Sequence, residues 1–96
     1  MTSKHYTDDR KIREELIKKI GLGNEIGTFR VDKGHPKGAE LHTVTDTGII
    51  VIRNERTHKM VTKLIARPNQ IKRYGIDRKD VIEIARKHQT LGYNMV

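Results

Sequence analysis

Residues 39–67 decide the fold of this 96-residue chain, and they read AELHTVTDTGIIVIRNERTHKMVTKLIAR. The run Ile49–Arg53 (IIVIR) begins with four consecutive β-branched apolar side chains. This pattern predicts a central strand that is covered on at least one face. Ala39–Thr45 before it and Met60–Arg67 after it are also typical of strands.

Turn-forming residues separate these three strands, and a fourth strand is predicted before them. Asp46–Gly48 predicts a tight turn, and a second turn is predicted at residues 54–59. The Gly- and Pro-containing stretch Asp32–Gly38 predicts a loop, and Glu25–Val31 before it alternates as a short strand. Pro68 ends the last strand, because proline has no N–H to donate to the sheet.

Helical periodicity appears on both sides of these strands. A helix is expected from Asp8 or Asp9 to Ile20, with Arg13 and Lys18 facing water and residues 1–7 frayed. Its apolar stripe consists of Ile12, Leu16, Ile17 and Ile20. A second helix is expected to begin at Asp77 and to end at Gly92.

The order helix, four strands, helix predicts an α+β fold. Because the strands are consecutive and their connections short, we expect a four-stranded antiparallel meander. The N-terminal and C-terminal helices are expected to pack on the sheet and to cover one of its faces. The length allows one small domain, residues 1–96.

Composition narrows the functional classes. The chain has 20 Lys and Arg against 12 Asp and Glu, a formal charge of +8, and no cysteine, so disulfides and thiolate chemistry are excluded. Neither a membrane-spanning run nor a signal-peptide core is visible. The expectation is a cytoplasmic protein with an anionic partner and no membrane association.

Most of the positive charge lies in one segment. Residues 53–73 hold seven Lys and Arg against the single acid Glu55, a net +6. Such a cluster is typical of a phosphate-facing surface, with RNA favoured over DNA. A solvated basic hairpin and an acidic protein partner remain the alternatives. The candidate nucleic-acid-binding residues are Arg53, Arg56, Lys59, Lys63, Arg67, Lys72 and Arg73.

The five histidines do not have the spacing of known metal sites, so no metal and no cofactor is predicted. A metal-free chemistry is open to the side chains that a meander brings together. RNA cleavage needs a base for the 2′-OH proton, an acid for the leaving 5′ oxygen and a cation for the phosphorane charge. The candidate catalytic residues are His35, His42, Arg53, Thr62, Arg67 and Tyr74, with Glu40 on the same strand face as His42.

The segment Gly48–Thr62 (GIIVIRNERTHKMVT) resembles the hairpin of the RelE/ParE-like and barnase–colicin group of small toxin nucleases. There an apolar strand ends in Asn, a Thr-containing turn follows, and the next strand begins with Val-Thr. The resemblance covers roughly residues 33–74 and implies a metal-independent ribonuclease. The small basic chain also resembles phage or mobile-element products.

The resemblance implies roles for individual residues. His35 or His42 would be the general acid or base, and Thr62 the hydroxyl of the late strand. Arg53, with Lys63 or Arg67, would supply transition-state cations, and Tyr74 would stack on a base or donate a proton.

The first functional hypothesis is therefore a metal-independent ribonuclease-like toxin domain that acts on RNA. The alternatives are a non-catalytic nucleic-acid-binding protein and a phage-type interaction protein or inhibitor that binds a host protein. A protein inhibitor of this chain is a further possible partner. Both a monomer and a homodimer are compatible with a thin core and a free sheet edge.

Overall fold

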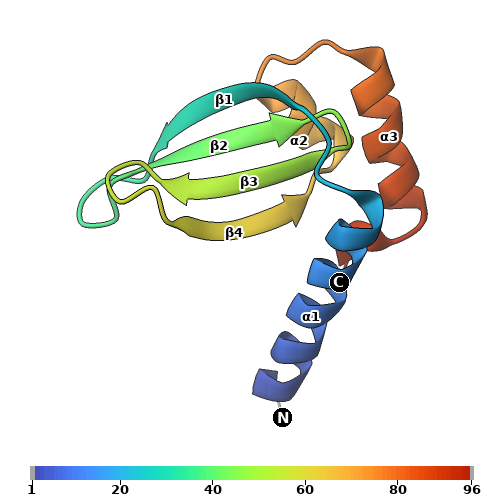
Figure 1. The fold of residues 1–96 in the computed structure, drawn as a ribbon, viewed down its shortest axis with the longest axis horizontal. Helices are drawn as coiled ribbons and strands as arrows, with labels where there is room; N and C mark the ends of the chain where they lie inside the picture. The colour runs from blue at the N-terminus through green and yellow to red at the C-terminus, as the bar shows by residue number, and fades with distance from the viewer. Residues whose placement is uncertain (1, 96) are drawn as a thin grey trace.

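The computed structural model describes residues 2–95, and side-chain surroundings from residue 10 to residue 94. One antiparallel sheet with strand order β1-β2-β3-β4 forms the centre of the molecule (Figure 1). The α+β meander predicted from the sequence is thereby confirmed. The elements are α1 (Thr2–Ile20), β1 (Glu25–Asp32), β2 (Ala39–Thr45), β3 (Ile49–Asn54), β4 (Met60–Ile65), α2 (Pro68–Arg73), α3 (Lys79–Thr90) and the short 3₁₀ helix η1 (Tyr93–Met95).

Two glycines fix the ends of elements as the sequence predicts. Gly21 has φ +84° and its N–H donates to the carbonyl of Ile17 at 2.8 Å, which terminates α1. Gly48 has φ +81° in the tight turn between β2 and β3. Both positions need a left-handed backbone, which glycine adopts without a Cβ penalty.

One face of the sheet, which we call the α2/α3 face, carries the larger core. Val44 of β2 and Ile50 and Ile52 of β3 point to this face, as the period of two along a strand requires. Helices α2 and α3 cover them. The buried partners in this cluster are Ala66, Ile71, Val81, Ile82 and Ala85.

The opposite face, which we call the α1 face, carries a smaller core. Here Ile49, Val51 and Ile65 pack against Ile17 of α1 and against Tyr93. The N-terminal half of α1 projects beyond the sheet (Figure 1), and Leu16, Ile17 and Ile20 of its C-terminal half take part in the packing. The sequence prediction that both terminal helices cover one face is therefore wrong, because β3 buries side chains on both sides.

The helices differ from prediction at their ends. The first helix already begins at Thr2 and so includes most of residues 1–7, which were expected to be frayed. Helix α2 was not predicted: Pro68 ends the strand run but also starts this helix, since its fixed φ suits a first helical turn. Helix α3 begins at Lys79, two residues after the predicted start at Asp77.

Two core and boundary predictions need correction as well. Ile12 was assigned to the apolar stripe of the first helix but is 46% exposed, because it is not among the helix residues that pack on the core of the α1 face. The last strand ends at Ile65 rather than Arg67, because the chain turns there toward α2. Among the described residues, no helix is long and apolar enough to cross a bilayer.

Truncation of Ile50 tests the assignment of the core. Ile50 is fully buried, so Ile50→Ala removes apolar contacts and leaves a cavity, which should lower the free energy of unfolding by about 2–5 kcal/mol. Ile12→Ala is the matched control, and it should change stability by no more than about 0.5 kcal/mol. Urea denaturation followed by circular dichroism measures both. Equal effects of the two substitutions would contradict the assignment.

Candidate functional site

A hydrogen-bonded chain of three side chains lies on the α2/α3 face. Glu40 and His42 share this face with Val44 because they alternate along β2. Tyr74 is the C-cap residue of α2, and its hydroxyl lies 2.7 Å from His42 Nδ1. His42 Nε2 lies 3.1 Å from Glu40 Oε1. The packing of α2 onto the sheet therefore joins residues 32 positions apart in the sequence.

The chemistry of the partners orients the imidazole of His42. An ionised carboxylate only accepts hydrogen bonds, so His42 Nε2–H donates to Glu40. In the neutral ring Nδ1 is then the acceptor, and the hydroxyl of Tyr74 donates to it. The order hydroxyl, imidazole, carboxylate is that of an activated hydroxyl whose base is oriented by a third group.

The cluster is largely shielded from water. His42 is 7% exposed, and Tyr74 is half-buried with its ring stacked on Phe29 at a centroid distance of 5.1 Å. Burial raises the pKa of Tyr74 above its usual value; Arg73 opposes this rise and Glu40 adds to it. The phenol therefore keeps its proton to a higher pH than a free tyrosine does.

A basic side chain borders the cluster. Lys33 Nζ, from the loop that precedes β2, lies 4.0 Å from Glu40 Oε1, and both side chains are open to solvent in part. Arg73, adjacent to Tyr74, is exposed at the end of α2. The carboxylate end and the phenol end of the cluster each have a cation beside them.

The predicted catalytic residues do not all meet at this place. His42 and Tyr74 are in contact, whereas Arg53 points to the α1 face, because its neighbour Ile52 is the residue opposite His42. His35 is exposed in the loop between β1 and β2. The expectation that the whole set gathers on one surface is therefore wrong, since alternation along β3 sends Arg53 away from His42.

Thr62 and Arg67 lie near the edge of the sheet. The hydroxyl of Thr62 accepts a hydrogen bond from Arg13 of α1 at 3.4 Å. Arg67 is exposed and precedes α2 as its N-cap residue, and its backbone N–H donates to Gln70 Oε1 at 2.8 Å. Neither residue hydrogen-bonds to His42 or Tyr74.

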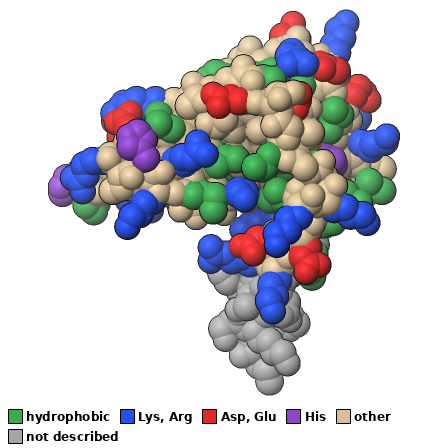
Figure 2. Space-filling model, in the orientation of Figure 1, with side chains coloured by type: hydrophobic (Ala, Val, Ile, Leu, Met, Phe, Trp, Pro, Cys, Tyr) green, Lys and Arg blue, Asp and Glu red, His purple; other side chains and the backbone are tan. Residues whose placement is uncertain are grey.

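The predicted nucleic-acid-binding residues spread over three parts of the structure. Arg56 and Lys59 are exposed in the turn between β3 and β4, which Asn54 shapes by accepting hydrogen bonds from the N–H groups of Arg56 and Thr57. Figure 2 shows Lys, Arg and His side chains gathered at this end of the sheet. Arg53 and Lys63 lie on the α1 face, and Arg67, Lys72 and Arg73 are exposed around α2.

Some residues of interest were missed by the sequence analysis. Lys33 lies in a polar loop, and no pattern separates it from other solvated lysines. Arg13 was predicted to face water, yet it is half-buried against β4, and only its position four residues before Ile17 hints at this. Among residues whose side chains are described, no group of three or more His, Asp or Glu is placed to hold a metal ion.

Comparison of the chain with protein-family models, with curated proteins and with solved structures finds no match. The function must therefore be argued from the residues and their geometry.

The raised pKa of Tyr74 predicts how stability depends on pH. The folded state holds the phenolic proton more tightly than the unfolded chain, so this stabilisation is complete below a pH of about 10 and is lost as the pH rises through the folded pKa. Tyr74→Phe lacks this pH dependence. Below that pH the variant should be less stable by about 1–3 kcal/mol, because Nδ1 of His42 loses its partner.

Urea unfolding of both proteins between neutral and strongly alkaline pH measures this effect. The stability gap between wild type and Tyr74→Phe should narrow above a pH of about 10. Tyr93→Phe, which removes a hydroxyl on the opposite side of the sheet, should retain the alkaline loss of stability seen in the wild type. A gap that stays constant with pH would show that Tyr74 is not perturbed.

Proposed function

We propose that the protein is a small RNA-directed, metal-independent ribonuclease-like protein with His42 as its general base. The observation that carries this proposal is the hydrogen-bonded chain Tyr74–His42–Glu40, with distances of 2.7 and 3.1 Å. A base must lie within hydrogen-bond reach of the group that it deprotonates, and a third group must hold its tautomer. The RNA substrate places the proposed activity in the cytoplasm.

The proposed reaction is attack of a ribose 2′-oxygen on the adjacent phosphorus. The hydroxyl of Tyr74 binds the 2′-OH. It donates its phenolic proton to His42 Nδ1 and takes the 2′-OH proton in its place. Glu40 stabilises the imidazolium that results. The bond from phosphorus to the 5′ oxygen breaks, a water molecule protonates that oxygen, and the imidazolium of His42 then returns its proton to solvent through Tyr74. The products are a 2′,3′-cyclic phosphate and a free 5′-hydroxyl.

The cations beside the cluster support this proposal. Lys33 lies next to Glu40 and Arg73 follows α2 next to Tyr74, so a phosphate between them meets positive charge from two directions. A positive charge that faces the developing phosphorane charge lowers the barrier. Arg53 cannot take this role, because it points to the other face.

Removal of single groups tests the proposed chemistry. Wild-type protein should cleave a fluorescent single-stranded RNA in excess EDTA, and His42→Asn or Tyr74→Phe should reduce the rate by about 10²–10⁴-fold. Cleavage is measured by gel electrophoresis, and the folded state of each variant by circular dichroism. An RNA with one 2′-deoxyribose should resist cleavage at that position.

Tyr93→Phe is the matched control for Tyr74→Phe, and it should cleave at the wild-type rate because Tyr93 belongs to the core of the α1 face. Absence of cleavage by the wild-type protein would remove the enzymatic proposal. Cleavage at the wild-type rate by both His42→Asn and Tyr74→Phe would contradict the assignment of His42 as the general base.

A second function, RNA binding without cleavage, is favoured by the position of the other cations. Arg53, Arg56 and Lys59 are exposed at the end of the sheet and do not belong to the His42 cluster. Phosphate contacts from such a surface give affinity that falls steeply with salt. This function needs no proton transfer and leaves the His42 cluster as a structural element.

Neutralisation of these cations tests binding separately from cleavage. Arg56→Gln and Lys59→Gln should each weaken RNA binding, and each should reduce the slope of log affinity against log salt by about 1. Lys79→Gln, an exposed lysine at the start of α3, is the control and should leave the slope unchanged. Fluorescence anisotropy at several salt concentrations gives the slopes. Equal effects at all three positions would indicate binding by overall charge alone.

A further inference from the structure

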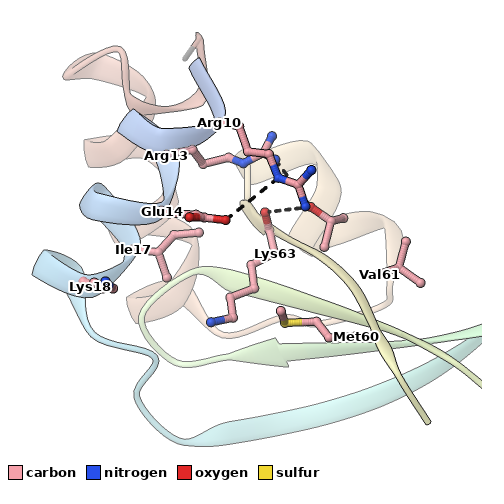
Figure 3. Close-up of a pocket in the computed structure, with 9 residues that line it drawn as sticks. Arg10, Arg13, Glu14, Ile17, Lys18, Met60, Val61 and Lys63 are labelled. Carbon is pink, nitrogen blue, oxygen red and sulfur yellow. Dashed lines mark hydrogen bonds and ion pairs between the residues drawn. The ribbon is translucent and has the colours of Figure 1, made fainter. Parts of the chain in front are cut away.

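A groove separates α1 from β4 on the α1 face. Its volume is about 270 Å³, and it lies between one side of the helix and β4, an edge strand of the sheet (Figure 3). Ile17, Met60 and Val61 supply its apolar surface. Pockets for whole small molecules are commonly about 300–1,000 Å³, so this groove suits one or two side chains of a longer ligand.

Two of the three apolar side chains of the groove are open to water. Met60 is 55% exposed and Val61 is 47% exposed, although both lie in a strand. Solvated apolar side chains that line a concave site are typical of interaction surfaces. An occupant that buries them contributes a favourable hydrophobic term, about 25 cal/mol for each Å² removed from water.

Positive side chains surround this apolar surface. Arg10, Arg13 and Lys18 come from α1, and Lys63 comes from β4 (Figure 3). Among the described residues that line the groove, the one acid is Glu14, which lies 3.9 Å from Arg10 in an exposed pair. Four cations against one carboxylate leave an excess of positive charge, which complements a negatively charged occupant.

Arg13 also contacts the strand directly. It is half-buried, and its guanidinium donates to the hydroxyl of Thr62 at 3.4 Å across the groove (Figure 3). A cation positioned in advance loses less side-chain entropy when it binds a carboxylate. The groove thus combines an open apolar patch with a partly fixed basic border.

The side chains of the groove favour a peptide over RNA. Among the residues whose side chains are described, no aromatic residue lines it, whereas single-stranded nucleic acids bind by stacking bases on aromatic rings. Aliphatic and thioether side chains instead suit apolar side chains of a protein. A second copy of this chain is disfavoured by its charge of +8.

We infer that the groove between α1 and β4 binds an acidic segment of another protein, with one bulky apolar side chain seated on Met60 and Val61. Carboxylates of that segment pair with Arg10, Arg13 and Lys63. This inference does not rest on the proposed cleavage of RNA, because Ile17 packs on the face opposite His42.

A selection from random peptides tests the inference without assuming a sequence. A phage library of random 12-residue peptides is selected on the folded wild-type protein, and binding of enriched peptides is measured by fluorescence anisotropy. Enriched peptides should carry net negative charge and at least one large apolar residue. Lys63→Glu and Met60→Asp should each weaken their binding at least tenfold.

Lys37→Glu is the matched control for Lys63→Glu, because Lys37 is exposed in the loop between β1 and β2. It should leave peptide affinity within about twofold, because Lys37 does not line the groove and charges more than about 10 Å from the ligand are screened by salt. Circular dichroism confirms that each variant is folded. Enriched peptides that lack negative charge, equal losses in Lys63→Glu and Lys37→Glu, or no enrichment would overturn the inference.

NMR distinguishes RNA from an acidic peptide as the occupant of the groove. Addition of a single-stranded RNA oligonucleotide should not shift the Met60 methyl signal at a concentration where an enriched acidic peptide does. If the RNA shifts this signal and displaces the peptide, the groove is a nucleic-acid site and the inference is wrong.

Discussion

The burial of β3 on both of its faces is the constraint on which the rest of the structure depends. Ile49, Ile50, Val51 and Ile52 are all buried, although successive side chains of a strand point in opposite directions. A sheet covered on one side only would leave two of them in water. The chain therefore needs apolar cover on both faces, and α1 supplies one layer while α2 and α3 supply the other.

This requirement also builds the candidate site. Ile71 of α2 is fully buried in the core of the α2/α3 face, and three residues later Tyr74 ends the helix beside His42. The hydrophobic docking of α2 thus positions the phenol, and Phe29 stacks on its ring from β1. The same two-sided cover has the opposite effect on Arg53, which follows Ile52 and so lies on the α1 face.

Positive charge is consequently distributed over separate surfaces. Lys33 and Arg73 border the His42 cluster, Arg56 and Lys59 occupy the turn at the end of the sheet, and Lys63 faces α1 across the groove. In the linear sequence all of these residues except Lys33 belong to one basic segment, 53–73, which predicts a single phosphate-facing surface. In the fold they border sites of different chemistry, one with a hydrogen-bonded hydroxyl, imidazole and carboxylate and another with exposed apolar side chains.

The sequence by itself determined the four strands, their order and their turns, because β-branched runs, glycines and Pro68 act through local backbone preferences. It also identified His42 and Tyr74 as candidates, since both residue types suit proton transfer. Only the tertiary structure decided that the helices lie on opposite faces, that Pro68 starts a helix, and that Tyr74 meets His42 while Arg53 does not. These outcomes depend on the face to which a side chain points and on contacts between distant segments. Neither the strand face toward a particular helix nor a contact across 32 positions is encoded in local periodicity.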